Sequence, residues 1–178
     1  MTQITLKDKQ FKPYIASEKI MEAVKGIAIK INADLKNDKP LFLVVLNGSF
    51  MFASDLLKEI NFACEISFIK VASYHGTSSS GTVTELIGLT EDVSNRTVVI
   101  LEDIVDTGTT LEKLISVLNK KNIKQYKVAT VFFKPSEYKK QTKLDYVGIE
   151  IPNEFVVGYG LDYDGFGRNL KDVYILAN

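Results

Sequence analysis

Several residue types are nearly or wholly missing from this chain, and each absence excludes a class of protein. Cys64 is the only cysteine in 178 residues, so neither an internal disulfide nor a cysteine-rich zinc site can form. No eighteen consecutive residues are apolar, and the N-terminus lacks the charged and then apolar segments of a secretory signal. We therefore expect a cytoplasmic protein with no membrane partner.

The chain also lacks an excess of charge of either sign. Lys plus Arg and Asp plus Glu both number 22, so no global field exists that would hold a nucleic-acid backbone. We expect no nucleic-acid partner, and any anion site must be local. Apolar residues make up 46% of the composition, which is enough for one sizeable core, and we expect residues 1–178 to form a single domain.

One stretch, from Val98 to Leu111, changes within fourteen residues from strand chemistry to phosphate-binding chemistry. It is V-V-I-L-E-D-I-V-D-T-G-T-T-L. The apolar, β-branched run from Val98 to Leu101 is typical of a strand buried on both faces of a parallel sheet. A helical pattern begins at Leu111, and a turn that opens a helix at a strand end presents unpaired N–H groups and a positive helix end to an anion.

Between strand and helix lie the groups that such a site needs: Glu102, Asp103, Asp106, Thr107, Gly108, Thr109 and Thr110. An Asp-Thr pair alone is more typical of a simple helix cap, and two carboxylates alone are typical of a solvated strand end. The combination of acidic pair, Asp, Thr-Gly and two more threonines at one strand end favours a binding site.

Strand and helix patterns alternate along the rest of the chain. A helical period begins after Ser17, an apolar run spans Leu41 to Leu46, and a second helical pattern covers Phe50 to Ile60. Further strands are expected at Glu65–Ser73, Tyr126–Phe133, Tyr146–Ile151, Val156–Tyr159 and Val173–Leu176. This order predicts an α/β fold with a mainly parallel twisted sheet flanked by helices.

Polar side chains follow three of these apolar runs directly, namely Asn47, Glu102 and Lys134. Because the carboxyl ends of parallel strands meet at one edge of a sheet, we expect all three at the same ligand crevice.

The stretch with E-D-I-V-D-T-G resembles the ribose-phosphate loop of the type I phosphoribosyltransferases, and in particular their 6-oxopurine (hypoxanthine-guanine) branch. The resemblance spans about Ile15 to Leu176. It implies the type I phosphoribosyltransferase fold, with a small hood formed from the N- and C-terminal segments. It also implies transfer of a 5-phosphoribosyl group from its 1-pyrophosphate (PRPP) to N9 of hypoxanthine or guanine in purine salvage, and a homodimer or homotetramer.

Leu46-Asn47-Gly48-Ser49 is typical of a tight turn with a serine cap. In the resemblance it occupies the place of the pyrophosphate loop, which has a cis bond, here expected between Leu46 and Asn47. Many members of that family carry Lys or Arg where this chain has Asn47, so a direct charge from this side chain is missing, while the backbone role of Asn47 and Gly48 is retained.

Residues Tyr74 to Thr82 contain almost no apolar side chains, and we expect them to be mobile. An exposed hairpin tip would have the same composition. The resemblance implies a catalytic loop in which Ser73 and Tyr74 close over the reaction centre. His75 is the only histidine, and its polar loop setting is typical of a solvated side chain.

Lys134 ends an apolar strand, where a strand-end lysine that reaches into solvent is an equally good interpretation. The resemblance makes it the donor to the purine O6. It makes Phe155 the aromatic that stacks on the purine, Val156 a backbone contact of the base edge, Asp162 a magnesium-side carboxylate and Arg168 a pyrophosphate contact. Without the resemblance, Phe155 would be interpreted as a core residue, and Asp162 and Arg168 as parts of a solvated turn.

In the implied reaction, Glu102 and Asp103 hold the ribose hydroxyls or the waters of Mg²⁺, Asp162 meets another metal water, and the threonine loop holds the 5-phosphate. Asp106 is the candidate general base. Two alternatives stay open: a purine-sensing regulator that binds PRPP, and a transferase that prefers xanthine.

Overall fold

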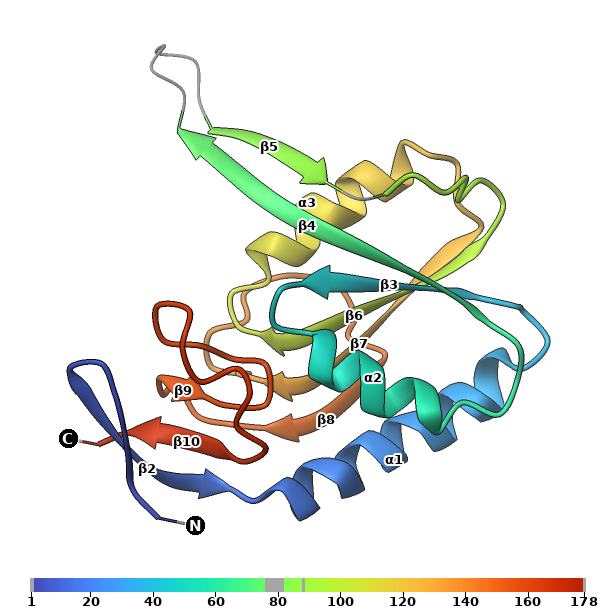
Figure 1. Cartoon of the computed structure of the whole chain (residues 1–178). Helices are drawn as coiled ribbons and strands as arrows, with labels where there is room; N and C mark the ends of the chain where they lie inside the picture. The colour runs from blue at the N-terminus through green and yellow to red at the C-terminus, as the bar shows by residue number, and fades with distance from the viewer. Residues whose placement is uncertain (1, 76–81, 88, 178) are drawn as a thin grey trace.

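The computed structural model describes residues 2–75, 82–87 and 89–177, with side chains described outside 72–88. Its main sheet has six strands in the order β5-β4-β3-β6-β7-β8, and β3, β4, β6, β7 and β8 run parallel (Figure 1). The bounds are β3 Leu41–Leu46, β4 Glu65–His75, β5 Thr82–Ile87, β6 Thr97–Val105, β7 Gln125–Phe133 and β8 Tyr146–Glu150. This confirms the expected α/β class.

Three helices flank this sheet and bury its two faces. They are α1 Ser17–Leu35, α2 Phe50–Lys58 and α3 Thr109–Asn119. The face with Phe42 and Val44 packs on α1 and α2, whereas the face with Leu41 and Leu43 packs on α3. The strands of both faces are almost fully apolar because both are covered.

A second, antiparallel sheet forms the hood from the two ends of the chain. Its order is β1-β2-β10-β9, with β1 Ile4–Leu6, β2 Lys9–Ile15, β9 Val156–Val157 and β10 Val173–Leu176. Figure 1 shows this sheet beside the carboxyl ends of β6, β7 and β8, with both chain termini in it. The hood therefore lies at the edge of the main sheet where the ligand crevice is expected.

The structure corrects several expected boundaries. β6 continues through Glu102 and Asp103 to Val105, because its pairing with β7 goes on after its pairing with β3 ends at Leu101. β4 extends to His75 and pairs with β5, a strand that the sequence pattern did not predict. Residues 76–81, the centre of the segment expected to be mobile, lie outside the described residues.

Candidate functional site

Three adjoining hollows lie at the carboxyl edge of the main sheet, and Ile104 lines all of them. The α3 hollow, of about 90 Å³, has Thr107, Gly108 and Thr110 in its wall. The Gly48 hollow, of about 340 Å³, lies between the β3–α2 loop and the end of β6. The Phe155 hollow, of about 230 Å³, lies between the main sheet and the hood. The arrangement suits a ligand with three differing parts.

The α3 hollow lies at the start of a helix, and a glycine shapes that start. Gly108 is the N-cap residue of α3 and takes a left-handed φ of 77°, which glycine adopts without steric cost. The Oγ1 atoms of Thr107 and Thr109 lie 3.1 Å apart, so hydroxyls and first-turn N–H groups converge at the positive helix end. The loop is covered from outside by Tyr138, because a Cβ on Gly108 would lie 2.5 Å from its Cε2 atom.

The Gly48 hollow joins the β3–α2 loop to the acidic pair. The Leu46–Asn47 peptide bond is cis, as the resemblance implied. A Cβ on Gly48 would lie 1.5 Å from Asp103 Oδ2, so the carboxylate of Asp103 occupies the space that only a glycine leaves free. Arg168 and Thr110 complete the wall of this hollow.

Glu102 and Asp103 are adjacent carboxylates in a desolvated place. Burial, and then the neighbouring charge of Asp103, raises the pKa of Glu102 well above its usual range. Burial also raises the pKa of Asp103 to about 6, although the N–H of Ile104 donates to its Oδ1 at 2.9 Å. A carboxylate pair in this state is suited to a cation or to hydroxyl donors that arrive with a ligand.

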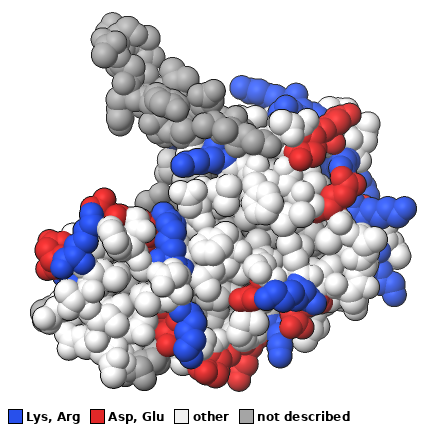
Figure 2. Space-filling view, in the orientation of Figure 1, with Lys and Arg blue, Asp and Glu red and all other residues white. Residues whose placement is uncertain are grey.

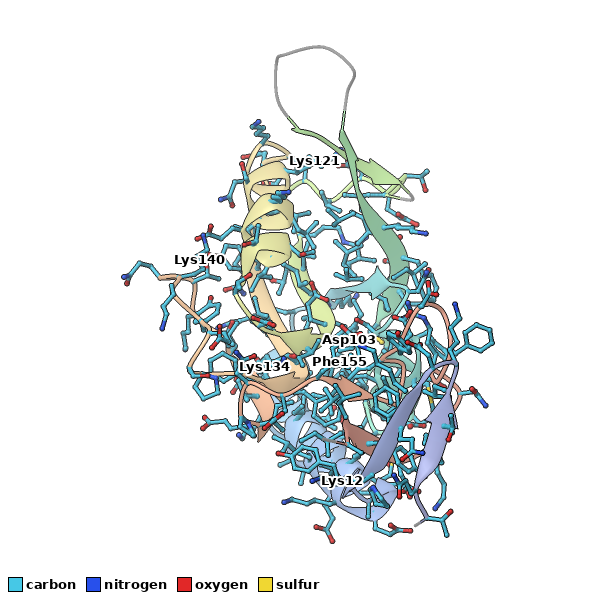
Figure 3. The ribbon with its side chains drawn as sticks, turned by 90° about the vertical axis from the view of Figure 1, so that its left-hand side faces the viewer. Lys12, Asp103, Lys121, Lys134, Lys140 and Phe155 are labelled. Carbon is cyan, nitrogen blue, oxygen red and sulfur yellow. The ribbon has the colours of Figure 1, made fainter. Side chains whose placement is uncertain are left out.

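The Phe155 hollow combines one flat aromatic surface with one buried cation. Lys134 is 8% exposed, so it does not reach into solvent as the simplest interpretation of a strand-end lysine would have it. Its Nζ lies 3.5 Å from Asp106 Oδ2. Phe155 is 46% exposed, which a core residue would not be, and Val156 beside it is buried. Figure 3 shows Lys134, Phe155 and Asp103 together at the junction of the main sheet and the hood.

The loop after β9 supplies the remaining candidate residues. Asp162 accepts the N–H of Gly165 at 2.7 Å and pairs with Arg168, whose Nη2 lies 2.5 Å from its Oδ1. Arg168 also donates through Nη1 to the carbonyl of Gly160 at 2.8 Å. The guanidinium is therefore held in place at the wall of the Gly48 hollow, not free in a solvated turn.

Two predicted residues are only partly described, and others were missed. Ser73 and Tyr74 lie in β4, where their backbones pair with Thr84 and Val83, but their side chains lie outside the described part. Ile104 and Tyr138 were not predicted as site residues from the sequence. Nothing local in the sequence indicates either contact, because each depends on strands and loops that meet only in the fold.

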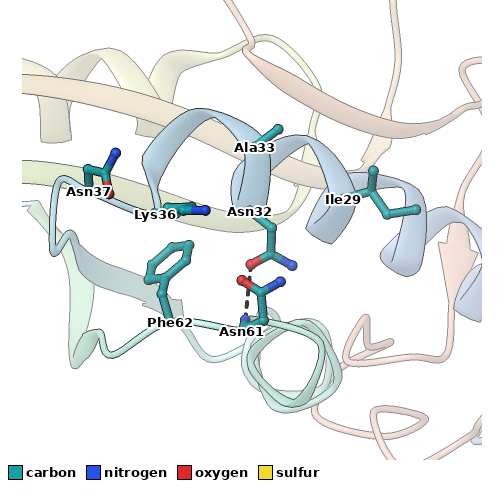
Figure 4. A pocket seen from close by; sticks show the side chains of 7 residues that line it. All are labelled: Ile29, Asn32, Ala33, Lys36, Asn37, Asn61 and Phe62. Carbon is teal, nitrogen blue, oxygen red and sulfur yellow. Dashed lines mark hydrogen bonds between the residues drawn. The ribbon is translucent and has the colours of Figure 1, made fainter.

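A roomier hollow, of about 750 Å³, lies elsewhere, between α1 and the α2–β4 connection (Figure 4). Its wall holds three asparagines and a single charged residue, Lys36. Both the oxygen and the nitrogen of the Asn32 amide have a partner in the protein, because the oxygen accepts the N–H of Asn61 at 3.0 Å and the nitrogen donates to the carbonyl of Glu59 at 2.8 Å. This surface offers no paired carboxylates, no nucleophile and no anion loop.

Comparison with known proteins agrees with this geometry. Residues 13–164 match the model of the phosphoribosyl transferase domain. A hypoxanthine-guanine phosphoribosyltransferase of Staphylococcus epidermidis is 42% identical over 158 residues, covering 88% of each chain, and one of Bacillus subtilis is 39% identical over 166 residues, covering 93% of this chain and 92% of that one. A hypoxanthine-guanine phosphoribosyltransferase of Bacillus anthracis, solved with HEPES in its active site, superposes with a TM-score of 0.85 at 32% identity, covering 93% of this chain and 98% of that one.

The fold and the matches define the class. The chain belongs to the phosphoribosyltransferase family, in its hypoxanthine-guanine branch.

Proposed function

We propose that the chain is a purine salvage enzyme that transfers the 5-phosphoribosyl group of PRPP to N9 of hypoxanthine, and also of guanine, releasing pyrophosphate. The observation that carries this proposal is the meeting of three hollows at Ile104. One offers an anion loop, the second an acidic pair beside a glycine loop, and the third a flat aromatic with a buried cation. A phosphoribosyl donor and a planar base have the matching parts.

The 5-phosphate fits the α3 hollow. The N–H and hydroxyl groups of Thr107, Gly108, Thr109 and Thr110 would surround its oxygens, and the helix end adds a favourable partial charge. The pyrophosphate fits the Gly48 hollow, where the backbone of Asn47 and Gly48 and the guanidinium of Arg168 would bind its oxygens. These two anchors fix the sugar between them.

The donor set of the site suits Mg²⁺, although within the described residues no three His, Cys, Asp or Glu side chains gather in a cage for a metal. Mg²⁺ is usually held by one or two carboxylates together with substrate phosphates, and Glu102, Asp103 and Asp162 would meet its waters or the ribose hydroxyls. When bound, Mg²⁺ neutralises charge that builds on the leaving group. The raised pKa values of Glu102 and Asp103 fit this role, because a cation would favour their charged forms.

The base fits the Phe155 hollow. The ring of Phe155 would stack on the purine, the backbone of Val156 would meet its edge, and the ammonium of Lys134 would donate to O6. Because Lys134 is buried, a base with an amino group at this position would face the ammonium with a donor and leave one of its N–H groups without an acceptor. An unmade buried hydrogen bond costs on the order of 1 to 3 kcal/mol, which disfavours adenine.

Asp106 lines both the α3 hollow and the Phe155 hollow, between the phosphate loop and the base. In the proposed reaction its carboxylate accepts a purine proton while N9 attacks the sugar. We also propose that Ser73 and Tyr74 close over the sugar during the reaction and exclude water from it.

The test is an assay of pyrophosphate release with PRPP, Mg²⁺ and each base in turn. We expect turnover with hypoxanthine and guanine and none with adenine. Asp106→Asn should lower kcat by about 100-fold or more while the Kd of PRPP changes little, because general-base catalysis contributes about that much. Equal losses in both would make Asp106 structural. A higher rate with xanthine than with hypoxanthine or guanine would make the protein a xanthine-preferring transferase. Absence of turnover with every base would favour a PRPP-binding regulator.

We further propose that the chain acts in the cytoplasm as a single domain and assembles as a homodimer or homotetramer. None of the described helices has the length and apolar character needed to cross a membrane.

A candidate surface for the assembly is a largely uncharged face over α2, β3 and β4 (Figure 2). Phe50, Ile66 and Phe68, on these elements, are each more than 40% exposed. Light scattering after gel filtration tests the assembly, and Phe68→Glu should shift it toward monomer.

A further inference from the structure

A buried tyrosine ties the loop after β9 to helix α2. Tyr159 is 2% exposed, and its hydroxyl donates to Asp55 Oδ2 at 2.9 Å. Its ring meets that of Phe132 edge-on, with the ring centroids 6.4 Å apart. Burial, and then the hydrogen bond to Asp55, raises the pKa of Tyr159, so its hydroxyl stays a donor throughout the working pH range.

The two residues of this hydrogen bond lie outside the Gly48 hollow, on the segments that carry two of its walls. Asp55 lies on α2, which begins directly after the Asn47-Gly48-Ser49 loop. Tyr159 is followed by Gly160, whose N–H donates to the carbonyl of Arg168 at 3.0 Å and whose own carbonyl accepts from the Arg168 guanidinium at 2.8 Å. The bond therefore connects the element after the glycine loop to the segment that holds Arg168.

The two walls touch backbone to backbone at a pair of glycines. A Cβ on Gly160 would lie 1.9 Å from the carbonyl oxygen of Gly48. Because neither glycine has a side chain, this contact sets how closely the two segments can approach each other. It resists sliding of one segment along the other only weakly. Within the described part of the chain, the bond from Tyr159 to Asp55 is the side-chain hydrogen bond that joins α2 to residues 158–161.

Further features show that the direction of Tyr159 is fixed. Its backbone takes a left-handed φ of 49°, which is unfavourable for a bulky residue and is maintained by surrounding contacts. Its N–H donates to the carbonyl of Leu170 at 2.8 Å. The other oxygen of Asp55 accepts from Lys58 at 2.7 Å, so the carboxylate is also held.

We propose that Tyr159 and Asp55 are positioning residues: their hydrogen bond holds the Asn47-Gly48 loop and Arg168 in register, so that both bind the same pyrophosphate group. The inference rests on the proposed function, because it assigns a task to residues that do not themselves line the Gly48 hollow. A loss of register of about 1 Å is enough to lower a rate substantially.

A matched control exists elsewhere in the molecule. Tyr146 is also 2% exposed, and its hydroxyl donates to Asp34 Oδ2 at 3.1 Å, joining β8 to α1. Tyr159→Phe and Tyr146→Phe therefore remove the same bond between a buried tyrosine and a helix carboxylate, and both keep the ring. Tyr146 lines none of the three hollows.

The experiment compares steady-state kinetics of the two variants in the full-length enzyme. We expect a similar small fall in Tm for both. For Tyr159→Phe we expect kcat/KM for PRPP to fall about tenfold while KM for hypoxanthine stays within about twofold, and for Tyr146→Phe neither should change. Asp55→Asn keeps an acceptor for the tyrosine and should retain most activity, whereas Asp55→Ala should match Tyr159→Phe. The double variant Tyr159→Phe with Asp55→Ala should be no worse than either single one.

Equal kinetic losses in Tyr159→Phe and Tyr146→Phe, or unchanged PRPP kinetics in Tyr159→Phe, would overturn the inference. Calorimetric titration with magnesium pyrophosphate separates it from the proposed function. If the wild type turns over no base, the proposed function fails. Weaker pyrophosphate binding by Tyr159→Phe alone still supports the positioning role, and equal binding by all variants, or none by the wild type, overturns it.

Discussion

At the scale of single residues, the site depends on places where a side chain is absent. Gly48 leaves room for the carboxylate of Asp103, and Gly108 takes the left-handed backbone angle with which α3 begins. The atom nearest to a hypothetical Cβ on Gly48 belongs to Asp103, which lines the Gly48 hollow, and the one nearest to Gly108 belongs to Tyr138. Substitution of Gly48 should therefore affect function more directly than folding, whereas substitution of Gly108 would also strain the backbone.

Gly48→Ala tests this expectation. The new methyl group must displace the carboxylate of Asp103, so we expect kcat/KM to fall by about 100-fold or more with little change in Tm. Gly26→Ala is the control, because nothing lies within 4 Å of its Cβ position. In the middle of α1 it should leave activity intact and raise stability by roughly 0.5 to 1 kcal/mol. A large fall in the Tm of Gly48→Ala would show a structural role instead.

Burial of Asp103 should make the stability of the protein depend on pH. Its folded pKa of about 6 lies above the ordinary value of 3.8 because burial disfavours the charge. A raised carboxyl pKa means that stability present at low pH is lost as pH rises from about 4 through 6. Without ligands, Asp103→Asn should therefore equal the wild type in Tm near pH 4 and exceed it by about 6 to 12 °C at pH 8. A constant difference across this range would contradict the assignment.

At the scale of elements, the amino ends of the strands are joined by a polar cluster on the side away from the site. Asp38, which follows α1, accepts from Lys124 at 2.9 Å, from Thr97 at 3.1 Å and from Gln125 at 3.1 Å. These partners lie at or next to the first residues of β6 and β7. One carboxylate thus aligns two central strands.

Asp38→Asn tests that alignment. The hydrogen bond from Lys124 lowers the pKa of Asp38, so the stabilisation is present above about pH 4 and is lost as pH falls through the depressed value. We expect the wild type to exceed the variant in Tm by about 1 to 2 °C at neutral pH, since partly exposed pairs contribute little, and this gap should shrink as the pH falls below about 4. Raising the salt concentration should narrow the gap, and an unchanged gap in acid would refute the role of charge.

The sequence predicted those elements whose pattern is local. Apolar runs such as Leu41–Leu46, followed by polar residues, placed Asn47, Glu102 and Lys134 at one edge, where the fold brings them together. It did not predict β5, and it ended β6 too early, because carboxylates inside a strand are explained only by the neighbouring strand. Links such as Tyr159 to Asp55 join residues about a hundred positions apart and have no local pattern.

At the scale of the whole molecule, the hood is attached to the main sheet through the start of α1. Asp172, just before β10, is 6% exposed and accepts the N–H of Ser17 at 2.7 Å. It caps a helix whose own N-cap residue, Ala16, has no side-chain hydrogen bond to offer. A hydrogen bond from the start of α1, which packs on the main sheet, therefore ends on a residue next to the hood strand β10.

Asp172→Ala should lower the free energy of unfolding by about 1 to 2 kcal/mol, as lost caps do, and Tm by about 3 to 7 °C. KM for the base should rise more than KM for PRPP, because β9 carries Val156 next to Phe155. Glu22→Ala, on the exposed face of the same helix, is the control and should change Tm by no more than about 1 °C. Equal effects of both substitutions would refute the capping role.

The strand order of the hood has a consequence for synthesis on the ribosome. β10 is made after every other strand, yet it lies between β2, which is among the first made, and β9. The loop of residues 106–110 can therefore be complete while the nascent chain still lacks β10, the strand that joins β2 to β9. Premature termination before Val173 should therefore yield a protein that keeps the residues of the α3 hollow, but in which β9 and the neighbouring Phe155 have lost the strand that supports them.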